Sequence, residues 1–82
     1  RYLPQVQAAF RGRTLTEAQL AAALSFHWNT GAIHQADWVQ SFLLGRRQRA
    51  WAEFMNWSRP REIIARRKAE RALFFDSRWS QD

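Results

Sequence analysis

The chain has 82 residues, which allows one small domain or lobe but is short for a complete catalytic cleft. Its hydrophobic content of 46%, with five Trp and six Phe, excludes a disordered chain. The formal net charge is +6, cysteine is absent, and no apolar run approaches the ~18 residues that span a bilayer, which excludes a disulfide framework, a thiolate metal site and a membrane span.

The first segment predicts a short helix that runs to about Phe10, with Pro4 in its first turn, and Arg11-Gly12-Arg13 ends it. Such a helix is too short to be stable alone. Because the chain also begins with Arg1 rather than Met, we expect that an upstream part of the protein precedes this sequence.

The next helix is predicted from Glu17 to Trp28, and the rest of the chain is organised around it. Thr16-Glu17-Ala18-Gln19 fits a capping box, which marks the start of the helix. The helix is apolar on more than one face, which predicts that it is buried among its neighbours. Asn29-Thr30-Gly31 then supplies a polar turn with a glycine that can take a positive φ and end the helix.

Three further helices are predicted after this turn. The first starts at Asp37 and ends before Gly45, the second runs from Arg46 to about Trp57, and the third runs from Pro60 to Phe75. Spacing assigns five side chains to the core, namely Trp51, Phe54, Trp57, Leu73 and Phe74. No strand-like alternation is present. The predicted fold is all-α, a bundle of about four to five helices around a buried central helix, with residues 1–82 forming one domain or lobe.

The positive charge is concentrated between Arg46 and Arg71, where eight Arg and one Lys face three Glu. One interpretation is a solvated surface with helical ion pairs, such as Glu62 with Arg66 and Arg67 with Glu70. The other is attraction to a polyanion, which could be nucleic acid, an acidic cell wall or an anionic lipid surface. No zinc-finger spacing, RNA-binding motif or clear helix-turn-helix accompanies the charge.

Residues that could carry catalysis are few. His27 fits a hydrogen-bonded histidine at the core or its rim, His34 fits a loop, and Ser25 lacks the glycines of a nucleophile elbow. Caps and ion pairs explain the helical carboxylates, which are Glu17, Glu53, Glu62 and Glu70. We predict no self-contained active site, no metal site and no cofactor.

Two sequence blocks suggest a family. Leu24-Ser25-Phe26, Trp28-Asn29 and Gly31 follow the capped start of the first block, and the second block combines Trp57 and Pro60 with the run from Arg66 to Phe74. In this order the blocks resemble the phage-type lysozymes, the endolysins of glycoside hydrolase family 24. The resemblance covers roughly residues 15–79.

The resemblance implies a muramidase of two lobes, which hydrolyses the bond between N-acetylmuramic acid and N-acetylglucosamine in peptidoglycan and so lyses bacteria. The family's catalytic glutamate, aspartate and threonine lie in an N-terminal lobe that has no counterpart here. This chain would therefore be the C-terminal, substrate-cleft lobe and would be inactive alone. Its implied partners are peptidoglycan and the N-terminal lobe, and its implied place of action is the cell wall in the periplasm, after synthesis in the host cytoplasm.

The resemblance also assigns substrate-binding residues, which are Trp28, Asn29, Thr30, Gly31 and Arg66. Asn29 would hydrogen-bond a sugar or peptide stem, Trp28 would offer apolar surface to the glycan or seal the core, and Gly31 would allow close approach. Arg66 would meet a stem carboxylate or form a surface ion pair. Two alternatives stay open: the turn merely ends a helix, or the chain is a non-enzymatic basic module that binds nucleic acid or another polyanion.

Overall fold

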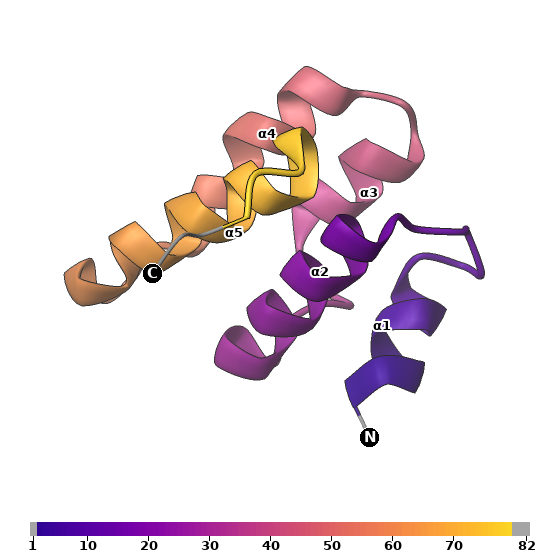
Figure 1. The fold of residues 1–82 in the computed structure, drawn as a ribbon, viewed down its shortest axis with the longest axis horizontal. Coiled ribbons are helices and arrows are strands. Elements are labelled where there is room, and N and C mark those ends of the chain that lie inside the picture. Colours follow the sequence, from indigo (N-terminus) through magenta and orange to yellow (C-terminus); the bar gives the residue numbers. More distant parts are fainter. Residues whose placement is uncertain (1, 80–82) are drawn as a thin grey trace.

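The computed structural model describes residues 2–79, apart from the side chain of Tyr2, and shows a bundle of five α-helices without a strand in this range (Figure 1). The predicted all-α fold is therefore confirmed, while Arg1 and residues 80–82 of the predicted domain lie outside the described residues. The helices, with two short 3-10 turns, are α1 Tyr2–Ala9, α2 Glu17–Thr30, α3 Asp37–Leu43, α4 Arg47–Phe54, η1 Met55–Trp57, η2 Arg61–Ile63 and α5 Ile64–Asp76.

The predicted capping box at the start of α2 and the predicted glycine stop after the helix are confirmed. The Thr16 hydroxyl accepts a hydrogen bond from the Gln19 amide at 3.0 Å, and the Gln19 side chain accepts one from the Thr16 amide at 2.9 Å. Gly31 takes a φ of 66° and donates its amide to the His27 carbonyl at 2.7 Å. The helix extends two residues beyond Trp28, because Gly31 is the first residue with left-handed geometry.

Helix α2 packs against α1 and α5 (Figure 1), and none of its residues from Ala18 to His27 is exposed. Ala22, Ala23 and Phe26 are fully buried, whereas Trp28 is 65% exposed. The predicted buried central helix is therefore confirmed for its middle, and only Glu17 at its start and Trp28 and Asn29 near its end are exposed.

Trp38 of α3 forms the centre of the core. Its side chain is fully buried, and its ring lies within 4.5–6.4 Å, between centroids, of five phenylalanine rings from the other parts of the bundle. These rings belong to Phe10, Phe26, Phe54, Phe74 and Phe75. One aromatic side chain thus connects the ends of α1, α2, α4 and α5.

The predicted core residues are confirmed with one exception. Phe54 and Phe74 are fully buried, and Trp57 and Leu73 are half-buried against the core. Trp51 is the exception, since it is 42% exposed and its ring lies under the Arg71 guanidinium, whose carbon is 3.7 Å from the ring centroid. A long cationic side chain, rather than the core, covers this indole.

The last helix begins later than the sequence predicts. Residues 61–63 form a 3-10 turn after Pro60, and regular α-helix starts only at Ile64. This turn and η1 form the connection between α4 and α5, which lies beside the C-terminal end of α2. Among the described helices, none is long and apolar enough to cross a bilayer.

Candidate functional site

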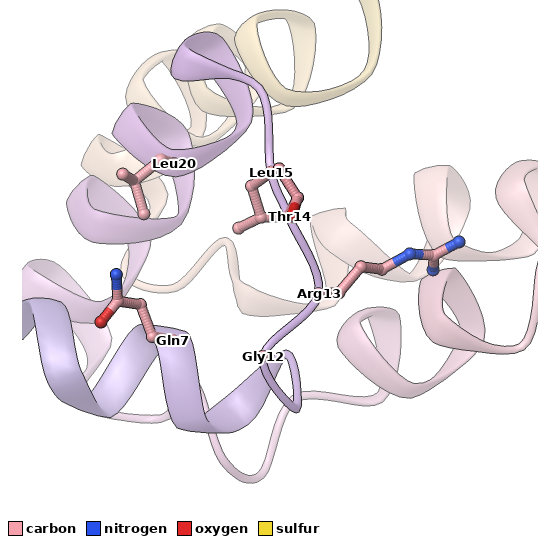
Figure 2. A pocket seen from close by; sticks show the side chains of 6 residues that line it. All are labelled: Gln7, Gly12, Arg13, Thr14, Leu15 and Leu20. Atoms are coloured by element: carbon pink, nitrogen blue, oxygen red, sulfur yellow. The ribbon is translucent and has the colours of Figure 1, made fainter.

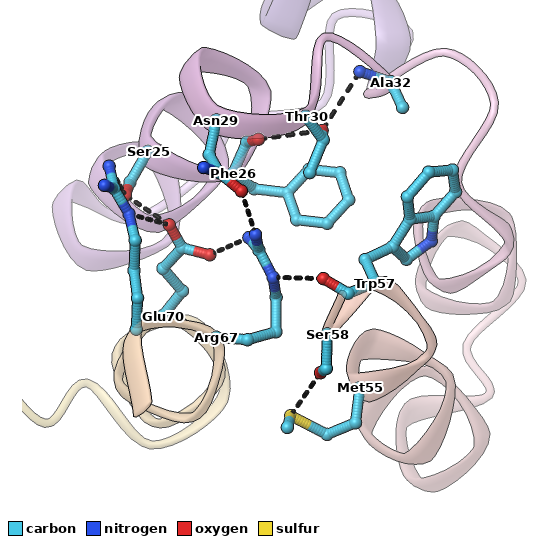
Figure 3. Close-up of polar contacts among 11 residues, drawn as sticks. Ser25, Phe26, Asn29, Thr30, Ala32, Met55, Trp57, Ser58, Arg67 and Glu70 are labelled. Atoms are coloured by element: carbon cyan, nitrogen blue, oxygen red, sulfur yellow. Dashed lines mark hydrogen bonds and ion pairs between the residues drawn. The ribbon is translucent and has the colours of Figure 1, made fainter. Parts of the chain in front are cut away.

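A buried arginine joins three elements at the C-terminal end of α2. The Arg67 guanidinium is fully buried and lies over the Phe26 ring, with its carbon 5.0 Å from the ring centroid. Its Nε donates to the Trp57 carbonyl at 2.8 Å, one terminal nitrogen donates to the Glu70 carboxylate, and the other donates to the Asn29 side-chain oxygen (Figure 3). Arg67 therefore ties α2 and η1 to α5.

The charge of Arg67 is balanced by Glu70, which is also buried. The Glu70 carboxylate further accepts a hydrogen bond from the Ser25 hydroxyl and pairs with Arg66 Nε at 3.4 Å. Burial lowers the pKa of Arg67 from its ordinary value, and the neighbouring Glu70 carboxylate opposes this shift. The result is a compensated ion pair in which the guanidinium keeps its proton.

A pocket of about 460 Å³ lies beside this network, within the size range of small-ligand sites. Its walls come from the C-terminal end of α2 and from the connection between α4 and α5. The lining residues are Asn29, Thr30, Asn56, Trp57, Arg59, Pro60 and Ile63. Two amides, an indole, a cation and apolar side chains thus line the same pocket.

The polar groups of this pocket differ in what they offer a ligand. The Thr30 hydroxyl is engaged, because it donates to the Phe26 carbonyl at 2.8 Å and accepts from the Ala32 amide at 3.1 Å (Figure 3). The oxygen of Asn29 is held by Arg67, so its nitrogen is the polar atom that stays available. The side chains of Asn56 and Arg59 are exposed and form no hydrogen bond or ion pair within residues 2–79.

The structure brings together only part of the predicted set. Asn29 and Thr30 line the pocket, whereas Trp28, Gly31 and Arg66 do not. Trp28 is too exposed to seal the core, and its contact with a glycan stays a prediction. A side chain at Gly31 would meet no atom within 4 Å, so its positive φ, rather than close packing, favours glycine here. Arg66 was expected either to meet a stem carboxylate or to form an ion pair, and in the structure it forms an ion pair with Glu70.

The sequence-based set lacks several residues of the site, namely Asn56, Trp57, Arg59, Pro60 and Ile63 in the pocket and Arg67 beside it. Trp57 was expected only to pack in the core, and nothing in the local sequence marks Asn56 or Arg59. A signal for Arg67 does exist, since it lies four residues after Ile63, three before Glu70 and seven before Phe74. This spacing places Arg67 on the same helix face as the buried side chains.

His27 is a hydrogen-bonded core histidine, as predicted. Its Nδ1 accepts from the Ile33 amide at 3.4 Å, so Nε2 carries the proton and donates to the Gln5 side-chain oxygen at 2.5 Å. Burial, and to a smaller extent the nearby His34, lowers the pKa of His27. His34 lies in the turn after α2, also as predicted.

The remaining carboxylates have structural partners or stay apart from the pocket. Glu53 accepts a hydrogen bond from the Ser41 hydroxyl at 2.5 Å and pairs with Arg49 at 3.3 Å. The predicted pairing of Glu62 with Arg66 is wrong, because Arg66 turns to Glu70 instead. Within the described range no cluster of three or more His, Cys, Asp and Glu side chains is arranged to hold a metal ion.

Two other pockets offer a ligand fewer unengaged polar groups. One, of about 410 Å³, lies between the loop after α1 and helix α2 (Figure 2), and its cation Arg13 instead covers the Phe42 ring and donates to the Phe42 carbonyl at 3.4 Å. The other, of about 480 Å³, lies between α4 and α5, and its Arg47 donates to the Phe75 carbonyl. The pocket at Asn29 is therefore the candidate site.

Comparison with protein-family models, with curated proteins and with solved structures finds no match to this chain.

Proposed function

We propose that this chain is the substrate-cleft lobe of a peptidoglycan-degrading lysozyme, and that the pocket at Asn29 binds the glycan. The observation that carries the proposal is the composition of the pocket, which Asn29, Asn56, Trp57 and Arg59 line together. Sugars present apolar ring faces that pack on indoles, and polar substituents that hydrogen-bond amides. Arg59 adds a cation for a carboxylate of the peptide stem.

The spatial relation between the two sequence blocks supports this proposal. Asn29 belongs to the first block and Arg67 to the second, 38 residues later, and the two side chains are hydrogen-bonded. Trp57, which opens the second block, is held by the same guanidinium. Three of the residues that carry the family resemblance, Asn29, Trp57 and Arg67, are therefore linked by hydrogen bonds beside one pocket.

In the complete enzyme, hydrolysis of the glycosidic bond needs a general acid and a second carboxylate or a positioned water. Glu70 and Glu53 are engaged in ion pairs and neither lines the pocket. The general acid would come from a lobe outside this sequence, and this chain would bind the substrate without cleaving it. Clearing of a peptidoglycan suspension by this chain alone would contradict the proposal.

The second candidate is a polyanion-binding module, which the exposed charge favours. Seven exposed cations have no ion-pair partner among residues 2–79, namely Arg11, Arg13, Arg46, Arg59, Arg61, Lys68 and Arg78. They are distributed over several elements rather than over one groove. Such a distribution suits non-specific attraction, which weakens steeply with salt.

Cosedimentation with insoluble peptidoglycan at about 150 mM salt separates the two candidates. Arg59→Ala and Arg46→Ala remove the same charge from exposed positions, but only Arg59 lines the pocket. We expect Arg59→Ala to reduce the bound fraction and Arg46→Ala to leave it unchanged. Equal losses in both variants, together with retention on DNA, would support the polyanion module instead.

A further inference from the structure

We propose that Arg67 sets the hydrogen-bonding polarity of the pocket, so that the site selects a ligand group that accepts hydrogen bonds, such as a carbonyl or carboxylate oxygen. This inference rests on the proposed glycan-binding function and names the chemical feature that the pocket recognises. Arg67 itself is a positioning residue, because it is fully buried and does not line the pocket.

The side chains of Arg67 and Asn29 differ in the hydrogen bonds that they can form. A guanidinium has only donors, whereas a side-chain amide has an oxygen that accepts and a nitrogen that donates. Because Arg67 donates to Asn29, the amide oxygen must face the guanidinium (Figure 3). The nitrogen of Asn29 is then the atom left for a ligand.

The orientation of the Asn29 amide is fixed because other contacts hold the Arg67 guanidinium in place. Glu70 and the Trp57 carbonyl hold two other donors of Arg67, and the Phe26 ring lies against it. A rotation of the Asn29 amide by half a turn would place donor against donor and leave a buried N–H unsatisfied. The network therefore selects one of the two amide orientations.

The same network removes acceptors from the pocket wall. The Trp57 carbonyl is occupied by Arg67, and the Thr30 hydroxyl uses its proton on the Phe26 carbonyl and accepts from Ala32. The groups left to a ligand are the donor nitrogen of Asn29, the Arg59 guanidinium and the exposed amide of Asn56, which can turn either way. A pocket rich in donors favours a ligand rich in acceptors.

Isothermal titration of the chain with two neutral sugars tests this selection. Chitotriose carries acetamido carbonyls, whereas cellotriose carries hydroxyl groups at the same positions. We expect the wild-type chain to bind chitotriose more tightly by about tenfold, the effect of one or two hydrogen bonds. A muramyl dipeptide in a third titration shows whether a carboxylate is accepted as well as the acetamido carbonyl.

The decisive variant is Asn29→Asp, which is nearly isosteric. Its carboxylate still accepts from Arg67, so the melting temperature should not fall, but the donor nitrogen is gone. We expect chitotriose affinity to fall about tenfold and cellotriose affinity to change little. Unchanged chitotriose affinity in Asn29→Asp would overturn the inference, whereas a wild-type chain that binds no sugar would overturn the proposed function itself.

Arg67→Lys tests the positioning role separately. Lysine keeps the charge opposite Glu70 but lacks the planar fork that holds Asn29 and Trp57 together. We expect the affinity ratio between chitotriose and cellotriose to fall toward one. An equal loss of both affinities would show a purely structural role for Arg67, and should this variant fail to fold, Asn29→Asp decides the question.

Discussion

At the scale of single residues, the pair formed by Arg67 and Glu70 dominates the energetics of the site. Removing one partner of a buried ion pair leaves the other charge uncompensated, whereas apolar replacement of both partners is often tolerated. We predict that Arg67→Met lowers the free energy of unfolding by about 3–5 kcal/mol. The double variant Arg67→Met with Glu70→Leu should be less destabilised, as measured by urea denaturation.

The comparison of these two variants identifies the cause of the loss. If the double variant unfolds at the same urea concentration as Arg67→Met, the uncompensated Glu70 carboxylate is not responsible. The broken hydrogen bonds to Asn29 and Trp57 would then account for the destabilisation.

The buried imidazole of His27 makes stability depend on pH. Its pKa is lowered in the folded chain relative to the ordinary value of 6.5, mainly by burial, so the unfolded chain binds more protons between the two pKa values. The contribution of neutral His27 to the free energy of unfolding is present in full above pH 6.5, and it is lost as the pH falls through the lowered pKa. We predict a lower melting temperature at pH 5.5 than at pH 7.5.

His27→Gln should flatten this pH dependence, because glutamine does not titrate. His34→Gln serves as the control, since His34 is exposed and makes only the smaller contribution to the pKa shift. A pH dependence that survives in His27→Gln would assign the effect to other groups.

At the scale of elements, local signals explain why α2 forms where it does. The Thr16 hydroxyl satisfies an amide that the helix itself leaves unpaired. We predict that Thr16→Ala lowers the free energy of unfolding by about 1 kcal/mol, measured by thermal denaturation. Thr14→Ala is the matched control, because Thr14 is exposed and caps no helix, and an equal loss in both variants would contradict the capping role.

The same local signals show how much of the fold the sequence predicts. Capping residues and glycines act within a few positions along the chain, so the start of α2 and the bounds of α3 could be placed closely. The start of α5 was missed because Pro60 permits either a 3-10 turn or an α-helix, and only packing against α2 and η1 selects between them. The position of Trp51 outside the core could not be predicted either, because its ring packs against Arg71, twenty residues away.

The sequence predicted only part of the candidate site. Asn29 and Thr30 belong to a turn that is visible in the sequence, whereas the pocket needs the connection between α4 and α5 to fold beside that turn. The pairing of Arg67 with Asn29 joins residues 38 positions apart, which no local pattern encodes.

At the scale of the whole molecule, Trp38 is the side chain on which the packing of the bundle depends. Truncating a buried aromatic residue costs about 3–5 kcal/mol, a large part of the ~5–15 kcal/mol that stabilises a typical domain. We predict that Trp38→Ala is largely unfolded by circular dichroism at 37 °C. Trp38→Phe should stay folded, because the indole N–H has no partner within the described chain and its removal breaks no hydrogen bond.

Glycan binding in the pocket at Asn29 can be measured by titrating the ¹⁵N-labelled wild-type chain with chitotriose and recording two-dimensional NMR spectra. We predict chemical-shift changes that centre on Asn29, Thr30, Asn56, Trp57 and Arg59. Changes confined to the pockets at Leu20 or Trp51, or a spectrum that the sugar leaves unaltered, would contradict this prediction.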